Sequence, residues 1–327
     1  MIRNLLITGF MLFSLPGLAQ FVPNNSQGFQ FMSMYNPAFS GMDEFTDIRL
    51  GYRYQWAGLN GAPKYANLSL NTRLKQPFDI TTNALRISNL KGLDIPAKKL
   101  LIHGLGVNVF QASYGQVQTI GGGLNYSLHF SLSRKLKLAT GVGVIIQNTK
   151  IDISKVAVRD PDRYYDYLLS NGFSKTDLNV RAGVLLYSSK FYLGITYLPL
   201  IQKSFQLPDS TSEGSIYTAS AQAGVSLQFS PAFLLKPSVL AMIYSDNSVA
   251  IDYNVKAFVG NRVWFGLSYR DIQAAVIMLG FNVNSALAVS YSYEMSMGKF
   301  KTFNDGSHEI VLAVKLNNFK RLDPYTW

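Results

Sequence analysis

The sequence predicts an all-β fold, a transmembrane antiparallel β-barrel of about fourteen strands. Three observations lead to this class. Segments of about ten residues alternate between apolar and polar side chains along most of the chain. Aromatic residues gather near the ends of these segments, as they do at the two interfaces of a membrane barrel. Short and long links between segments also take turns along the chain, whereas a soluble sandwich would explain only the alternation of side chains.

The alternation begins in a hairpin of residues 47–56 and 64–74, joined by a turn at residues 58–63. Successive side chains of a strand point to opposite faces, so the first segment has one apolar face and one polar face. The apolar face carries Ile48, Leu50, Tyr52, Tyr54 and Trp56, and the polar face carries Arg49, Gly51, Arg53 and Gln55. This hairpin predicts two strands with one side toward lipid and the other toward the interior.

The same pattern recurs to the C-terminal region and supplies the remaining strands. We expect strands within residues 104–114, 120–131, 135–152, 175–187, 191–198, 217–229, 233–244, 251–259, 263–270, 272–283, 287–295 and 310–317. Most of these segments have the length of a tilted barrel strand that crosses a bilayer. The total of about fourteen is even, as it is in bacterial outer-membrane barrels.

The links predict which end of the barrel faces which compartment. With both termini in the periplasm, the short links at residues 133–135, 188–190, 230–231, 260–261 and 282–284 are periplasmic. The long links at residues 153–174, 199–216 and 298–306 are then outer loops. The link at residues 75–102 breaks this rule, because it is long and periplasmic. Together with residues 21–41 it suggests a periplasmic contact surface, and a plain flexible loop is the alternative.

The N-terminus predicts export. Arg3 provides a positive region, residues 5–15 are apolar, and Gly17-Leu18-Ala19 forms a cleavage site, so residues 1–19 are expected to be a signal peptide. The mature chain, residues 20–327, is then a single outer-membrane barrel with an irregular lead-in at residues 20–46. We therefore expect a multi-pass protein of the cell outer membrane. The chain contains no cysteine, so its stability comes from burial and backbone pairing.

The charge balance is basic, with a formal net charge of +11 and only 15% charged residues. A basic chain attracts anionic partners, and export argues against nucleic acid. Lipopolysaccharide phosphates, acidic polymers or an acidic protein fit better. Charges on polar strand faces are expected to line the lumen, where they set the anion preference of a channel or cross-link and fill the interior; we favour the second role. These lumen charges are Arg49, Arg53, Arg73, Arg181, Asp252, Lys256, Arg270, Glu294 and Lys315.

The sequence offers little for an enzyme or a cofactor. The pair His308-Glu309 lacks the second histidine of a zinc-protease helix, and no nucleophile-elbow motif is present. A serine with His103 or His129 would be needed for an outer-membrane hydrolase. Asp160, Asp162 and Asp166 have oxygen ligands for calcium, but arginines lie between them and favour a self-paired loop. We expect a protein without catalytic activity or cofactor.

Residues 36–64 carry a family resemblance. The run Asn36-Pro37-Ala38-Phe39-Ser40-Gly41 is followed by residues 52–56 (YRYQW) and residues 60–64 (NGAPK). These runs resemble the N-terminal signature of the PorP/SprF family, outer-membrane proteins of Bacteroidota associated with type IX secretion and gliding motility. The positions that carry the resemblance are Asn36, Pro37, Ala38, Gly41, Tyr54, Gln55, Trp56, Gly61, Ala62 and Pro63.

The resemblance implies a barrel that does no chemistry. Such a protein would bind, anchor or assist the export of a large cell-surface protein through that protein's C-terminal domain. The outer loops would hold the secreted protein, the periplasmic segments would touch other secretion components, and outer-membrane lipid and lipopolysaccharide would surround the barrel. A porin-like diffusion channel for small solutes is the alternative from another class, and a hydrolase is a third.

Overall fold

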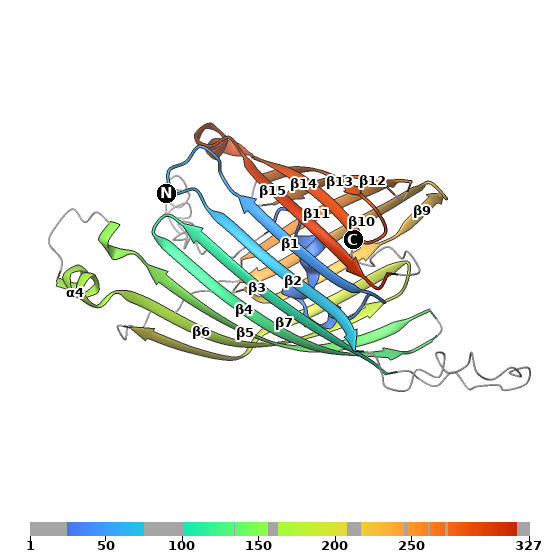
Figure 1. Ribbon diagram of the computed structural model, residues 1–327, viewed down its shortest axis with the longest axis horizontal. Helices are drawn as coiled ribbons and strands as arrows, with labels where there is room; N and C mark the ends of the chain where they lie inside the picture. Colours follow the sequence, from blue (N-terminus) through green and yellow to red (C-terminus); the bar gives the residue numbers. More distant parts are fainter. Residues whose placement is uncertain are drawn as a thin grey trace, which may run out of the picture.

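Fifteen antiparallel strands form one closed sheet in the computed structural model of the protein (Figure 1). The structure describes residues 25–74, 101–133, 135–155, 163–207, 217–244, 248–260, 262–271 and 274–318. The strands are β1 (Thr46–Tyr54), β2 (Lys64–Leu74), β3 (Ile102–Tyr114), β4 (Val117–Ser131), β5 (Lys137–Ile151), β6 (Phe173–Tyr187), β7 (Phe191–Leu207), β8 (Tyr217–Val225), β9 (Leu227–Ser230), β10 (Phe233–Tyr244), β11 (Val249–Val259), β12 (Val263–Arg270), β13 (Ala274–Asn282), β14 (Leu287–Ser296) and β15 (Ser307–Leu316). None of the helices in these residues is long and apolar enough to span a membrane.

The sheet closes because its first and last strands pair. β1 pairs with β15 from Thr46 opposite Leu316 to Tyr54 opposite His308. β8 and β9 both pair with β10 and form one span with a break at Ser226, so fourteen spans make the ring. Closure leaves no unpaired sheet edge around the ring, which is what a sheet in lipid requires. The predicted barrel of about fourteen strands is confirmed.

Burial alternates along the strands and separates an apolar outer face from a polar inner face. In β12, the outward Phe265 and Leu267 are 53% and 63% exposed, whereas the inward Ser268 and Arg270 are buried. Lipid solvates the outward side chains, so their exposure to solvent is not an energetic penalty in the membrane. The inner face carries the polar set because the lumen is the one place in the bilayer where polar groups find partners.

The turns predicted as periplasmic lie at one end of the barrel, and serine or asparagine side chains hold several of them. Short links occur at the other end too, as between β3 and β4 and between β12 and β13, so the predicted alternation of short and long links is wrong there. Ser133 Oγ accepts hydrogen bonds from the backbone N–H groups of Lys135 (3.3 Å) and Leu136 (3.1 Å). Ser188 Oγ does the same for Lys190 (3.1 Å) and Phe191 (3.2 Å). These side chains mimic a backbone turn, which explains the short links between β4 and β5 and between β6 and β7. This is the end that the sequence places in the periplasm.

At the opposite end the barrel wall is uneven in height. β5, β6 and β7 contain 15, 15 and 17 residues, whereas β12 and β13 contain 8 and 9. Figure 1 shows the long strands reaching outward on the side of α4 (Arg163–Asn171). The prediction of an outer loop at residues 199–216 is wrong for residues 199–207, which continue β7.

The structure describes different parts of the other long links. Residues 153–174 contain η4 (Ile153–Lys155) and α4, and β6 begins at Phe173. Residues 298–306 contain η5 (Gly298–Phe303). The expected periplasmic excursion lies at residues 75–100 outside the described residues, as do the expected signal peptide (residues 1–19), Asp160 and Asp162. These expectations stay predictions.

We predict that Gly280→Val destabilises the barrel. Gly280 lies opposite Trp264, and a Cβ at Gly280 would overlap the Trp264 indole ring. Overpacking of this kind costs about 1–3 kcal/mol. Urea unfolding in detergent micelles, followed by tryptophan fluorescence, measures the loss. The matched control is Gly122→Val, where a Cβ would meet only Asn108 O at 3.4 Å; an equal loss in both variants would contradict this role of Gly280.

Candidate functional site

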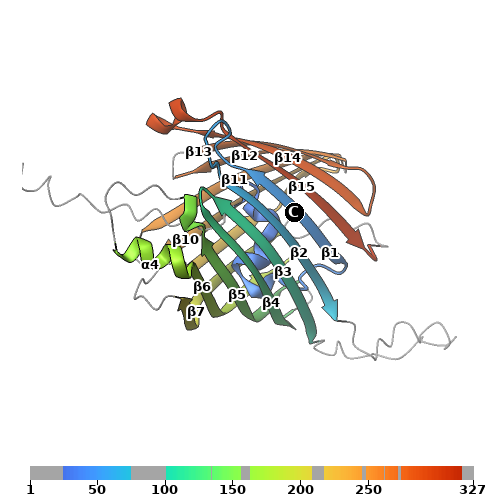
Figure 2. The ribbon, with the colours of Figure 1, turned by 60° about the vertical axis from the view of Figure 1, so that its left-hand side comes forward.

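The lumen holds the chain's own N-terminal segment, which we call the plug (residues 25–45). It contains η1 (Gly28–Phe31), α2 (Met32–Tyr35) and η2 (Pro37–Phe39). All plug residues except Met34, Asp43 and Glu44 are buried. Figure 2 shows the plug's short helices, in dark blue, inside the ring of strands. The expected periplasmic contact surface at residues 21–41 is therefore wrong for residues 25–41, which lie in the lumen.

Aromatic contacts show that the plug packs against two separate parts of the wall. Phe29 packs edge-to-face on Trp264 of β12, with ring centroids 6.3 Å apart. Phe39 packs edge-to-face on Tyr192 of β7, with centroids 5.5 Å apart. Lys256 lies 3.6 Å from the centre of the Trp264 ring, within the range of a cation–π contact. The plug therefore buries apolar side chains against the inner wall.

A carboxylate on β15 holds the beginning of the plug. Glu309 accepts hydrogen bonds from the backbone N–H groups of Ser26 (2.6 Å) and Gln27 (3.2 Å). Ser26 Oγ donates a third bond to Glu294 of β14 (2.8 Å). Hydrogen bonds to charged groups are stronger than neutral ones, so these two carboxylates fix the first backbone amides of the plug.

The carboxylates that meet the plug belong to a buried ion-pair network. Glu294 pairs with Arg53 of β1 (2.8 Å) and with Arg270 of β12 (3.0 Å). Arg270 also pairs with Asp252 of β11 through Nη2 (2.9 Å) and Nε (3.1 Å), and its Nη2 donates to Asn25 O (3.1 Å). Buried charges are costly unless they are paired and hydrogen-bonded. The network thus joins strands β1, β11, β12 and β14 to the plug.

Guanidinium groups hold the middle and the end of the plug by its carbonyl oxygens. Arg181 of β6 donates to Ser33 O (3.1 Å) and to Met34 O. Arg73 of β2 donates to Gly41 O (2.8 Å) and Met42 O (2.6 Å). A guanidinium has several donors in a fixed plane, which suits two successive carbonyl groups.

Asn36 anchors the first half of the family motif (residues 36–41) to the barrel wall. Its backbone is extended (φ −139°, ψ 115°), as expected before a proline, and its Oδ1 accepts from Ala38 N–H at 2.9 Å. Its Nδ2 lies within hydrogen-bond distance of Val184 O (3.3 Å), Ile195 O (3.2 Å) and Gln222 Oε1 (3.1 Å). One side chain therefore caps η2 and binds strands β6, β7 and β8.

Glycines in the wall make room for the motif. A Cβ at Gly183 would overlap the Asn36 side chain, and a Cβ at Gly141 would overlap the backbone of Pro37 and Ala38. A Cβ at Gly104 would overlap Ser40 O. Gly41 has φ +70°, a conformation that glycine adopts readily, at the point where the chain turns toward β1. Residues 36–41 can lie this close to the wall only because glycine occupies these strand positions.

The second half of the motif lies at the outer rim. Gln55 N–H donates to Pro63 O (2.8 Å), Ala57 N–H to Gly306 O (2.7 Å), and Gly115 N–H to Gly61 O (2.9 Å). Trp56 and Gly61 have positive φ angles of 53° and 72°. Tyr54 and Trp56 are half-buried, and Ala62 and Pro63 are buried. The turn between β1 and β2 is thus fastened to both neighbouring outer turns.

The structure places the predicted lumen charges on the inner face. Arg73 is half-buried, and the others are buried: Arg49, Arg53, Arg181, Asp252, Lys256, Arg270, Glu294 and Lys315. Arg49 pairs with Asp47 (2.7 Å) and donates to Gln30 of the plug (3.2 Å). Sequence analysis missed Asp47 and Glu309. Glu309 lies six residues before Lys315, so the period of two already places it on the inner face.

A serine and a histidine do lie together inside the barrel. Ser127 Oγ is 3.1 Å from His129 Nε2, but both groups also contact Ser40 O, at 2.5 Å and 2.8 Å, and both residues are fully buried. They hold the plug rather than facing an open pocket. Among the described residues, no group of three or more His, Cys, Asp or Glu is placed to hold a metal ion.

We predict that Glu309→Ala loosens the beginning of the plug. Losing a hydrogen bond to a charged group costs about 1.5–3 kcal/mol, which corresponds to about 10- to 100-fold faster amide exchange. Hydrogen-exchange mass spectrometry of peptides that contain Ser26 and Gln27 measures this. Glu44→Ala is the control, because Glu44 lies at the other end of the plug, where its carboxylate pairs with Arg73 at 3.7 Å. Unchanged exchange in Glu309→Ala would contradict the clamp.

We also predict that Gly141→Val displaces the motif from the wall. The natural chain lacks cysteine, so Ala38→Cys provides a single thiol at a buried position. That thiol is expected to resist a soluble maleimide in the otherwise unchanged protein and to react at least tenfold faster with Gly141→Val added. Gly122→Val in the same Ala38→Cys background is the control. Equal reactivity in both would show that Gly141 does not seat the motif.

Solved structures similar to this chain include a channel, a transporter and an outer membrane protein. The CymD monoaromatic hydrocarbon channel has a TM-score of 0.46 and 14% identity, over 90% of this chain and 92% of CymD. The Pseudomonas putida toluene transporter TodX has a TM-score of 0.45 and 10% identity, over 86% and 91%. Acinetobacter baumannii Omp33 has a TM-score of 0.44 and 10% identity, over 85% and 99%. No match was found among curated proteins.

The family comparison agrees with the motif inside the barrel. The model of the family described as type IX secretion system membrane protein PorP/SprF matches residues 17–314. This match covers the plug, every strand up to β15 and most of β15 itself. The chain therefore belongs to the PorP/SprF family of type IX secretion system membrane proteins, and it is a multi-pass β-barrel of the outer membrane.

Proposed function

We propose that this protein is a non-enzymatic barrel that binds, anchors or assists the export of a large cell-surface protein through that protein's C-terminal domain. The observation that carries the proposal is the filled lumen. Both ends of the plug and its middle are held by charged side chains of the wall. In a barrel with an occupied lumen, the outer rim and the turns are the surfaces available to bind partner proteins. The filled lumen also favours this role over a diffusion channel for small solutes.

The tall side of the wall supplies the surface for the secreted protein. Leu200, Ile201 and Phe205 on the outer part of β7 are 53%, 55% and 61% exposed. Within the described residues, β7 pairs with β8 only as far as Tyr197, and its continuation pairs with β6 alone. α4, which carries the exposed Tyr167 and Leu169, lies on the same side.

Other contacts follow from the orientation. The turns at the short-link end would meet other components of the type IX secretion system, and the apolar outer face would meet outer-membrane lipid. Lipopolysaccharide would surround the outer half of the barrel. We propose no catalytic step, because the buried Ser127 and His129 serve the plug.

The test is a pull-down of the tagged barrel from its native outer membrane in mild detergent, followed by mass spectrometry. We expect a large secreted protein in near-stoichiometric amount, attached through its C-terminal domain. In Ile201→Arg/Phe205→Arg we expect at least tenfold less of it, because charges replace apolar contacts on the tall side.

The matched control is Phe303→Arg. Phe303 is 66% exposed in η5, at the outer rim but on another part of the barrel. Recovery of the secreted protein is expected to stay at the natural level in this variant. A barrel recovered without a secreted partner, under conditions where a known membrane complex survives, would contradict the proposal. Equal recovery from both rim variants would reject the tall side as the docking surface.

A further inference from the structure

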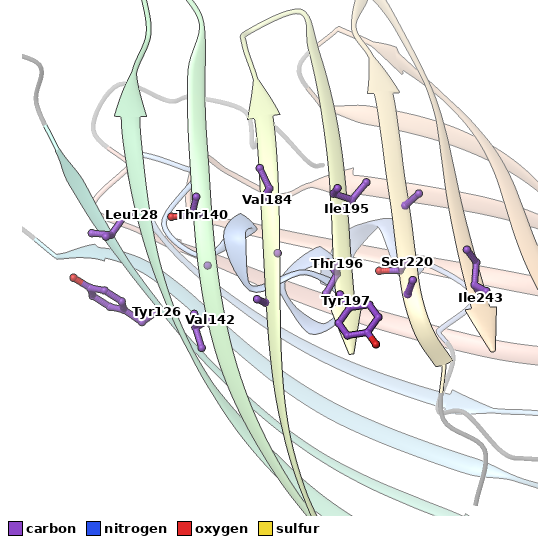
Figure 3. Close-up of a pocket in the computed structure, with 15 residues that line it drawn as sticks. Tyr126, Leu128, Thr140, Val142, Val184, Ile195, Thr196, Tyr197, Ser220 and Ile243 are labelled. Carbon is purple, nitrogen blue, oxygen red and sulfur yellow. The ribbon is translucent and has the colours of Figure 1, made fainter. Parts of the chain in front are cut away.

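An apolar groove lies on the outer, lipid-facing wall of the barrel (Figure 3). It has a volume of about 630 Å³ and crosses strands β4 to β8 and β10. A groove of this size is within the range of small-molecule sites. Tyr197 and Ile195 are 59% and 61% exposed, which places the groove on the side of the wall opposite the plug.

Strand register explains why this part of the wall is hollow. One row of paired residues runs across the strands in the order Tyr126, Val142, Ala182, Tyr197, Ala219 and Ile243. The small side chains of Ala182 and Ala219 form the floor of the groove, and larger side chains of the same row stand beside them. The adjacent row places Thr140 and Ala221 beside Val184 and Ile195.

The groove runs obliquely between the two ends of the barrel, and at β10 it reaches Ile243, one residue from the outer end of that strand. Leu128, Thr140 and Val184 lie three residues from the strand ends at Ser131, Lys137 and Tyr187. Three residues of a tilted strand span about 10 Å. This part of the groove is therefore near the short-turn end of the barrel, in the leaflet that the sequence places toward the periplasm.

The turns below the groove carry exposed cations. Lys135 lies in the turn between β4 and β5, and Lys190 lies in the turn between β6 and β7. Both strand pairs contribute to the groove wall. Positive side chains at the membrane surface attract anionic lipid headgroups by about 1 kcal/mol each. The apolar groove thus suits the acyl chain of a phospholipid, and the basic turns suit its anionic headgroup.

We propose that this groove binds an acyl chain of an anionic phospholipid of the periplasmic leaflet, with its phosphate beside Lys135 and Lys190. The groove floor is fixed from the other side of the same strands. The carbonyl groups of Val184 and Ile195, whose side chains line the groove, accept hydrogen bonds from Asn36 of the plug. A floor held in this way keeps its shape before the lipid arrives, which lowers the entropic cost of binding.

The test uses phosphatidylglycerol with a photoactivatable group in one acyl chain, in vesicles that contain the full-length mature protein. After illumination, mass spectrometry maps the crosslinked peptides. We expect crosslinks concentrated on groove residues, and at least tenfold fewer there in Ala182→Leu/Ala221→Leu, which fills the floor. The control is Ala257→Leu, an outward-facing alanine on β11 away from the groove; its crosslinks are expected to stay at the natural level.

A second arm tests the headgroup. Lys135→Gln/Lys190→Gln is expected to remove the preference for phosphatidylglycerol over an equally labelled phosphatidylcholine, while crosslinks stay in the groove. Crosslinks spread evenly around the barrel would overturn the proposal, because the lipid would then be only annular. A protein partner crosslinked to the groove in native membranes, in place of lipid, would overturn it as well. This inference rests on the outer-membrane location and is independent of the secreted protein proposed above.

Discussion

The buried polar side chains of the inner wall require hydrogen-bond partners, and the rest of the structure depends on how they find them. Lipid covers the outer face of the barrel, so most polar side chains of the strands turn inward. Once the lumen is filled, these groups lose water, and an unpaired buried charge or amide is costly. The backbone of the plug supplies the missing partners. The barrel wall and the plug therefore satisfy each other's hydrogen-bonding groups.

Charged side chains of the wall hold the backbone of the plug by both its N–H and its C=O groups. At the start of the plug, Glu309 accepts from two free N–H groups and Arg270 donates to Asn25 O. Further along, Arg181 and Arg73 donate to carbonyl groups. These contacts fix the segment in the lumen from its beginning to its end.

Sequence predicted the barrel well because lipid imposes a period of two on every strand. It predicted the inward direction of residues such as Arg53 and Arg270 for the same reason. The plug was missed because its helices contain only three or four residues, too few for a period to show. The continuation of β7 past Pro199 was also missed. The pairing of β6 with β7 has an irregularity there, between Val180 and Ala182, and proline in a strand normally signals an end.

The contacts of the plug predict that it closes the lumen of this secretion-system barrel. Single-channel recording of the intact protein in planar bilayers measures whether the lumen is closed, with a porin of similar strand number as the positive control. A closed lumen predicts insertion of the protein without steady current at moderate voltage. A stable, voltage-independent conductance from the intact protein would contradict the claim and favour a diffusion channel.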